Sequence, residues 1–179
     1  MKITRQLIVL CLSYVLVAYA QGNYFNKVRY TGGTLSANVK PKDWGNRLTV
    51  SSDAITLALK DGQVVKIDPS LVTGLSYGQE AHRRVGTMVA LGVLFLPLAL
   101  FGLFHKTRLH FIGVQYKTSD NKKEGVLLQG DKKNYRAMIL ALQGASGVPV
   151  SVAENERKFL AVGTNVAIEA KQEPAKEGL

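Results

Sequence analysis

The sequence predicts a mainly β fold with one helix near the C-terminus, which is an α+β class. Three observations predict it: short runs in which apolar and polar residues alternate, turn signals between those runs, and one segment with helical spacing of apolar residues. The chain has 179 residues, 46% apolar and 20% charged, so a wholly disordered protein is excluded. This length suggests a single domain. Two strongly apolar segments, residues 7–20 and 85–104, stand apart from the pattern.

Residues 1–20 have the layout of a secretory signal peptide. A short basic start precedes an apolar run, and Ala18-Tyr19-Ala20 has the small-x-small pattern that signal peptidases cleave. We therefore expect a mature chain that begins at Gln21, lacks Cys11 and carries 21 basic and 13 acidic residues, a net charge of +8. The alternative is an uncleaved anchor, although 14 residues are short for a span. Export places the protein in the cell envelope, on the periplasmic side in a Gram-negative cell.

The first part of the β-domain is expected over residues 21–84. Its strands are predicted where apolar residues alternate or form short runs bounded by turn residues. These are residues 47–51, 54–60, 64–67 and 71–77. Asp61-Gly62 predicts a hairpin turn between the second and third of them, with Gly62 as its structural glycine.

Residues 85–104 contain no charged residue, and at 1.5 Å per residue a 20-residue helix would reach about 30 Å, the thickness of a bilayer core. Basic residues flank the segment on both sides and are expected to lie at the membrane interface. They are Arg83, Arg84, His105, Lys106 and Arg108. Membrane contact is therefore predicted, and the protein is expected to be membrane-associated.

The path of this segment has three possible forms. If the strands before and after it belong to one sheet, both halves lie on the same side of the membrane, which favours a bent insert that turns near Pro97. Hydropathy alone favours a single span. A helical hairpin buried in a soluble protein is the third form.

Residues 105–152 are expected to complete the β-domain. Strands are predicted over residues 109–116, 125–128 and 148–152, with a polar turn at 118–121 and a further turn at Gly130. Asp131 is typical of a helix N-cap and opens a closing helix over residues 132–144, whose apolar positions follow the spacing i, i+3, i+4 and i+7. Residues 153–179 are predicted to form a charged, partly disordered tail.

Several of these runs resemble bacterial pleckstrin-homology-like (PH-like) and GRAM-type domains. The resemblance rests on residues 48–57, on the Asp61-Gly62 turn and on Val65-Lys-Ile-Asp-Pro-Ser-Leu-Val, followed by the late helix. Tyr30-Thr-Gly-Gly-Thr and Leu75-Ser-Tyr-Gly-Gln also resemble uncharacterised exported bacterial proteins with an apolar insertion after the Tyr-Gly-Gln. The resemblance covers about residues 28–152. It implies a curled sheet or small barrel closed by a helix, in a membrane setting, and it implies no catalytic group.

One pattern raises the possibility of an enzyme. Gly74-Leu75-Ser76-Tyr77-Gly78 matches the Gly-x-Ser-x-Gly pattern of serine hydrolases, which requires a strained strand-to-helix turn followed by an acid and a histidine. Here an apolar segment follows the pattern, and no large α/β sheet precedes it. The three histidines have no metal-ligand spacing. We therefore expect no catalytic activity, no cofactor and no metal.

The leading interpretation is a membrane-associated binding or scaffold module of the envelope. The alternative is a soluble exported carrier of an apolar ligand, and a serine hydrolase is a third, weaker one. Expected partners are the lipid bilayer, with anionic lipid favoured by the charge, and a protein of unknown identity, whereas export argues against nucleic acid. Lys122-Lys123 and Lys132-Lys133 would form a basic rim if the sheet brought the two pairs together.

Overall fold

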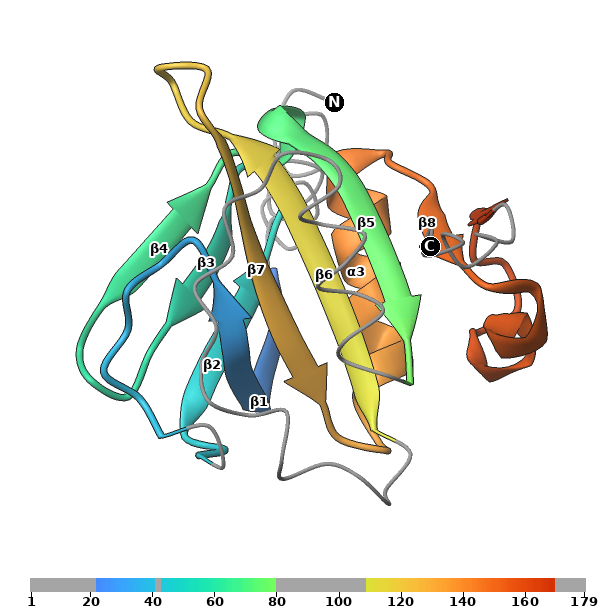
Figure 1. Ribbon diagram of the computed structural model, residues 1–179, viewed down its shortest axis with the longest axis horizontal. Coiled ribbons are helices and arrows are strands. Elements are labelled where there is room, and N and C mark those ends of the chain that lie inside the picture. Colours follow the sequence, from blue (N-terminus) through green and yellow to red (C-terminus); the bar gives the residue numbers. More distant parts are fainter. Residues whose placement is uncertain (1–21, 41–42, 80–108, 170–179) are drawn as a thin grey trace, which may run out of the picture.

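The computed structural model describes residues 22–40, 43–79 and 109–169, which form one curled sheet and a helix, α3 (Figure 1). Nine strands of the described residues are hydrogen-bonded in the order β4-β3-β2-β1-β7-β6-β5-β8-β9. Their bounds are β1 Asn23–Gly33, β2 Asn46–Val50, β3 Ile55–Ala58, β4 Val64–Ile67, β5 Val72–Gly78, β6 His110–Lys117, β7 Lys123–Gly130, β8 Val150–Val152 and β9 Val166–Ile168. The predicted mainly β, α+β class is confirmed.

Two antiparallel meanders joined by one long strand make up most of the sheet, and β8 and β9 extend it in parallel beside β5. Strands β1 to β4 form the first meander, and β5 to β7 form the second. The early part of β1 pairs with β2, Val28 pairs with both β2 and β7, and the residues after Val28 pair with β7. Irregular register between Phe25 and Val28 and between Tyr30 and Gly32 bends β1, as β-bulges do. β1 therefore joins the two meanders into one curled sheet.

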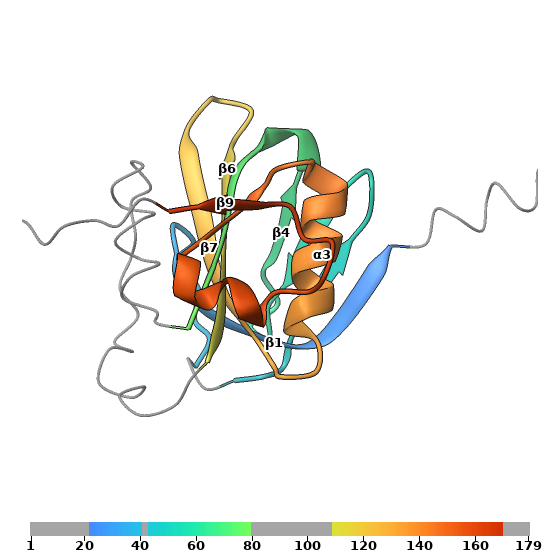
Figure 2. The same cartoon turned by 90° about the vertical axis from the view of Figure 1, so that its right-hand side faces the viewer.

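Helix α3, Tyr135–Ser146, packs against the inner face of this sheet (Figure 2). Met138 and Leu142 are fully buried and belong to the same apolar cluster as Val28, Leu48 and Leu128 from both meanders. One core therefore includes residues of both halves, because the helix lies over the bend between them. Gly147 ends the helix in the left-handed conformation that favours glycine, with φ at 72°.

The helix begins at Tyr135, three residues later than predicted. Asp131 nevertheless caps the turn that precedes it, since its carboxylate accepts hydrogen bonds from the backbone N–H groups of Lys133 (2.8 Å) and Asn134 (2.9 Å). The carbonyl of Asp131 also accepts from the N–H of Tyr135 at 3.1 Å. Asp131 therefore caps the backbone just before the helix, as predicted, and the helix itself begins one turn later, at Tyr135.

Two expectations from the sequence need correction. β1 was not predicted as a strand. Residues 153–169, assigned to the charged tail, contain a 3-10 helix, η2 (Glu154–Phe159), and the strand β9, which pairs in parallel with β8. The region predicted as a partly disordered tail therefore begins with ordered elements, which the sequence analysis did not predict.

Several predictions fall outside the described residues. They are the signal peptide at 1–20, the apolar insert at 85–104 and the end of the tail, residues 170–179. Within the described ranges, no helix has the length and apolar character needed to cross a membrane.

Candidate functional site

The residues just before and just after residues 80–108 lie on neighbouring strands, β5 and β6. Gly78, the last residue of β5, is the register partner of Phe111 in β6. His110, the first residue of β6, is the partner of Gly130, the last residue of β7. The chain therefore leaves and re-enters the sheet at the same end, which is the lower end of β5, β6 and β7 in Figure 1. We call this the exit end, and α3 begins beside it.

A buried aromatic cluster lies beneath the exit end. The ring of His110 stacks on that of Tyr135 with centroids 3.6 Å apart and an interplanar angle of 2°, and Tyr77 lies against both rings. A hydrogen bond of 2.9 Å joins Tyr77 Oη and His110 Nδ1. The hydroxyl of Tyr135 donates to the carbonyl of Phe159 at 2.8 Å. Strands β5 and β6, helix α3 and η2 are thus held together at one point.

The surroundings of this cluster disfavour charge on the imidazole. Burial lowers the pKa of His110, and the positive charges of Arg136 and Lys132 lower it further. Burial also raises the pKa of Tyr77 well above its usual value. Glu156 is buried nearby, where its Oε1 accepts a hydrogen bond from the backbone N–H of Gln79 at 2.8 Å. This bond ties η2 to the residue that follows β5.

Exposed basic side chains gather at the exit end. They are Lys27, Lys132, Lys133 and Arg136, and we call them the basic cluster. The amide of Asn134 donates to the carbonyl of Lys27 at 2.9 Å, which fixes this part of β1 beside the start of α3. Among the described residues, Lys60 and Asp43 form an ion pair of 2.8 Å, whereas no member of the basic cluster is ion-paired. The positive charge here is therefore not neutralised by neighbouring carboxylates in direct contact.

Arg29 adds a further guanidinium on β1, two residues beyond Lys27. It lies 4.0 Å above the ring of Trp44, and its Nη1 donates to Gln129 Oε1 at 3.3 Å. Burial lowers its pKa. Because Trp44 and Gln129 hold it, Arg29 is a structural cation at the bend of β1 rather than a freely exposed one.

The residues predicted to lie at the membrane interface are not among those that the structure describes. Arg83, Arg84, His105, Lys106 and Arg108 lie outside the described residues, as does Pro97. The two glycines predicted as structural turn residues, Gly62 and Gly130, are among the described residues. Gly62 lies in the β3–β4 turn with φ at 93°, a conformation that favours glycine. At Gly130 a Cβ would lie 2.8 Å from Tyr135 Cβ, so β7 and α3 approach too closely for a larger residue.

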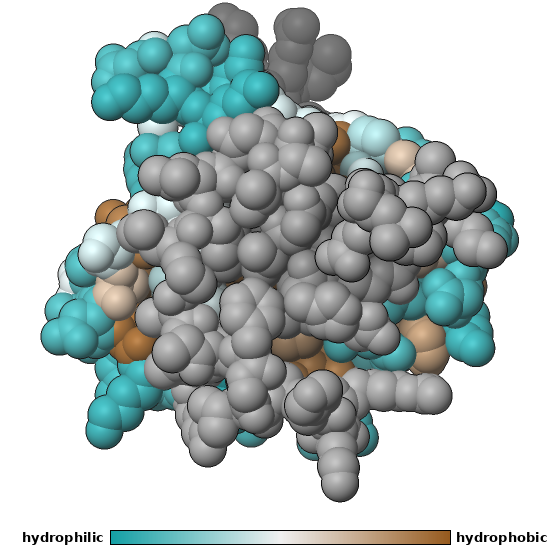
Figure 3. All heavy atoms as spheres, in the orientation of Figure 1, coloured by the Kyte–Doolittle hydropathy of each residue, from teal (hydrophilic) through white to brown (hydrophobic). Residues whose placement is uncertain are grey.

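The two lysine pairs are not brought together. Lys122-Lys123 lies where β7 begins, and Lys132-Lys133 follows its end. Eight residues of extended strand place the pairs about 26 Å apart. The turn between β6 and β7, which projects at the top of Figure 3, is hydrophilic. The condition for a rim of both pairs is therefore not met, and Lys132-Lys133 joins Lys27 and Arg136 instead.

Ser76 does not occupy a nucleophile elbow. It lies within β5, where it pairs with Gly113 of β6 and with Ser151 of β8, and not at a strand-to-helix turn. Only 3% of it is exposed, and its Oγ has no hydrogen-bond partner among the residues that the structure describes. In the described part of the chain, no three His, Cys, Asp or Glu residues are grouped so that they could hold a metal ion.

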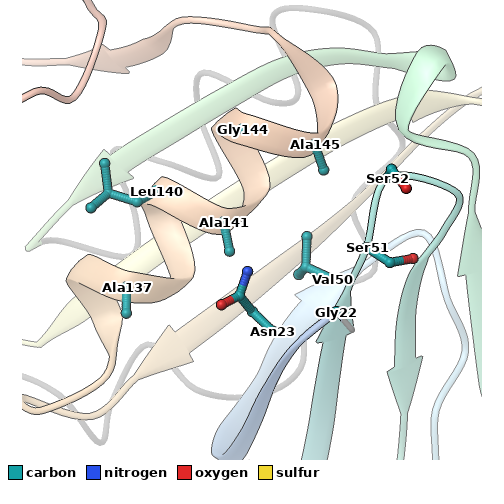
Figure 4. Close-up of a pocket in the computed structure, with 10 residues that line it drawn as sticks. All are labelled: Gly22, Asn23, Val50, Ser51, Ser52, Ala137, Leu140, Ala141, Gly144 and Ala145. Atoms are coloured by element: carbon teal, nitrogen blue, oxygen red, sulfur yellow. The ribbon is translucent and has the colours of Figure 1, made fainter. Parts of the chain in front are cut away.

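A groove runs between α3 and the beginning of β1. It has a volume of about 510 Å³, and its lining is mostly small and uncharged. Ala137, Ala141 and Ala145 line it from the helix, and Gly22 and Asn23 face them from the strand side (Figure 4). It presents no titratable group.

Comparison with known proteins identifies no family. No family model matches the chain, and no curated protein matches it. One solved structure, described as the structure of the Spt16D Pob3N heterodimer, aligns with 76% of this chain at 10% sequence identity and a TM-score of 0.41. This chain spans 57% of the length of that chain.

Sequence reasoning singled out Lys132 and Lys133 but missed the other two members of the basic cluster, Lys27 and Arg136. Lys27 and Lys132 are separated by more than a hundred residues, and only the pairing of β1 with β7 brings them close. The run Lys132-Lys133 and Arg136 around a predicted helix start was the available signal, because it places cations at one end of a helix. Lys27 had no comparable signal, since β1 itself was not predicted.

Proposed function

We propose that this protein is a non-catalytic binding or scaffold module of PH-like fold, exported and attached to a membrane of the cell envelope through residues 85–104. The strand order supports the PH-like assignment: a four-stranded meander, a three-stranded meander that β1 joins to it, and a helix that follows β7 and covers the inner face. This strand order, and the covering of one face by the helix, are those of a small curled sheet closed by a C-terminal helix.

The register of β5 and β6 is the observation that carries the proposal. Because Gly78 and Phe111 are partners, the halves of the domain on either side of the apolar segment lie on one side of any membrane that the segment enters. Twenty residues are enough for one crossing and not for two. The apolar segment therefore acts as an insert that enters the bilayer from the exit end and returns there, with the folded domain outside.

This geometry allows a direct test of attachment. Residues 80–108 are replaced by a loop of about four residues, a length that closes hairpins between paired antiparallel strands. We expect the variant to keep the far-ultraviolet circular dichroism of the folded domain and to move from the membrane fraction to the soluble fraction. The control is the unaltered chain, which should need detergent for release.

Two results would contradict the proposal. If the unaltered mature chain fractionates as soluble without detergent, attachment through residues 85–104 is wrong, and the carrier of an apolar ligand becomes the better interpretation. If the folded variant stays in the membrane fraction, another part of the molecule attaches it.

A further inference from the structure

We propose that the basic cluster is a docking surface for the anionic lipid headgroups of a bilayer. The proposal rests on the proposed membrane attachment and names the lipid class that the domain recognises. Lys27, Lys132, Lys133 and Arg136 all lie at the exit end, where the chain leaves toward residues 85–104. The cations would thus face the membrane surface that the apolar segment enters.

The charge at this end favours an anionic partner. The four cations outnumber the two carboxylates that make hydrogen bonds here: Asp131 accepts from the backbone N–H groups of Lys133 and Asn134, and the buried Glu156 accepts from that of Gln79. The N-terminus of α3 adds its partial positive charge beside Lys132 and Lys133. The effect of Arg136 and Lys132 on the pKa of His110 is consistent with their positive field at this end.

Bilayer headgroups fit this surface better than a single small anion. The lysines are exposed, and their ammonium groups are not fixed by side-chain partners within the described residues, so they form no rigid pocket. A charged surface of flexible lysines attracts a layer of negative charge, and each lysine near such a layer contributes about 1 kcal/mol. The interaction is also expected to weaken with salt, because the Debye length is about 8 Å at physiological ionic strength.

The test compares the full mature chain with a triple variant, Lys27→Gln, Lys132→Gln and Lys133→Gln, by flotation with vesicles. Vesicles of phosphatidylcholine alone are compared with vesicles that also contain phosphatidylglycerol. We expect tighter binding of the unaltered chain to the anionic vesicles, and a loss of about a hundredfold in the triple variant, from about fivefold per lysine. Binding to neutral vesicles should be the same for both.

A matched control neutralises three lysines elsewhere, Lys66→Gln, Lys117→Gln and Lys122→Gln, which removes the same charge from β4 and the β6–β7 hairpin. This variant should keep most of the anionic binding. Equal losses in the two triple variants would overturn the proposal in favour of net charge alone. Equal binding of the unaltered chain to neutral and anionic vesicles would also overturn it while leaving membrane attachment intact. No binding to either vesicle would refute the attachment itself.

Discussion

At the scale of single residues, His110 connects the stability of the exit end to pH. Its buried ring stacks on Tyr135 and is hydrogen-bonded to the Tyr77 hydroxyl, and its pKa lies below the ordinary value of 6.5 because burial, then Arg136 and Lys132, oppose its charge. The unfolded chain therefore binds a proton at His110 more readily than the folded chain does. The contribution of neutral His110 to stability is complete above about pH 6.5 and declines as pH falls from there toward the folded pKa.

The variant His110→Phe isolates this effect, because it keeps an aromatic ring for stacking and removes the titration. It removes the hydrogen bond between the imidazole and the Tyr77 hydroxyl, so we expect a loss of about 0.5–1.5 kcal/mol at pH 7.5. Urea unfolding at pH 7.5, 6.5 and 5.5 should show a steeper decline below pH 6.5 in the unaltered chain than in the variant. Parallel decline in both proteins would show that other groups carry the pH dependence.

At the scale of elements, α3 stabilises the sheet through one face. Leu142 is fully buried in the core shared by both meanders, whereas Leu140 is 39% exposed at the groove. Leu142→Ala should therefore lower the free energy of unfolding by about 2–5 kcal/mol, through lost apolar contact and the cavity left behind. Leu140→Ala is the matched control and should cost about 1 kcal/mol or less. Urea denaturation measures both, and similar losses in the two variants would contradict this assignment of the helix faces.

Elements with an undisturbed period, and short apolar runs bounded by turn residues such as β6 and β7, were predicted correctly from the sequence. β2 and β3 alternate between core and surface, and the helix repeats Tyr135, Met138, Ile139 and Leu142, all buried. β1 was missed because its bulge breaks the alternation. Phe25 and Val28 both face the core although they are three residues apart, which is not the period of a regular strand.

η2 and β9 were missed for a different reason. The sequence of η2 is too polar to indicate packing, and β9 has only three residues, too few to show a period. Side chains distant in the sequence help to hold both elements in place. Gln143 of α3 donates through Nε2 to the carbonyl of Asn165 at 2.6 Å and accepts from its N–H at 2.9 Å. Arg136 donates to the carbonyl of Phe159 at 2.9 Å. Such bonds between residues more than twenty positions apart leave no periodic signal in the sequence.

In the candidate site, too, some features could be recognised from contiguous sequence and others depend on contacts between distant residues. The apolar segment and its charged flanks could be recognised from the sequence, because they are contiguous. The position of Lys27 beside Lys132 and the stack of Tyr77, His110 and Tyr135 depend on how the two meanders meet. These features required the tertiary structure.

At the scale of the whole molecule, the two halves on either side of residues 80–108 form one folding unit. β5 pairs with β6 from Val72 to Gly78, and β1 pairs with β7 from Val28 to Gly33. The core residues beneath α3 come from both halves. The covalent connection between β5 and β6 is therefore not needed to keep the halves together once the protein has folded.

A cleavage experiment tests whether the two halves form one folding unit. A protease recognition site is inserted between Gln79 and Glu80, at the exit end, and the folded protein is cleaved in mild detergent. Because the β5–β6 and β1–β7 pairings remain, we expect both pieces to elute together in size-exclusion chromatography with unchanged circular dichroism. Unfolding should become dependent on protein concentration, since the pieces now associate as two molecules. The uncleaved insertion variant is the control and should unfold independently of concentration. Separation of the pieces under native conditions would mean that the halves fold apart, as a single membrane span between them would require.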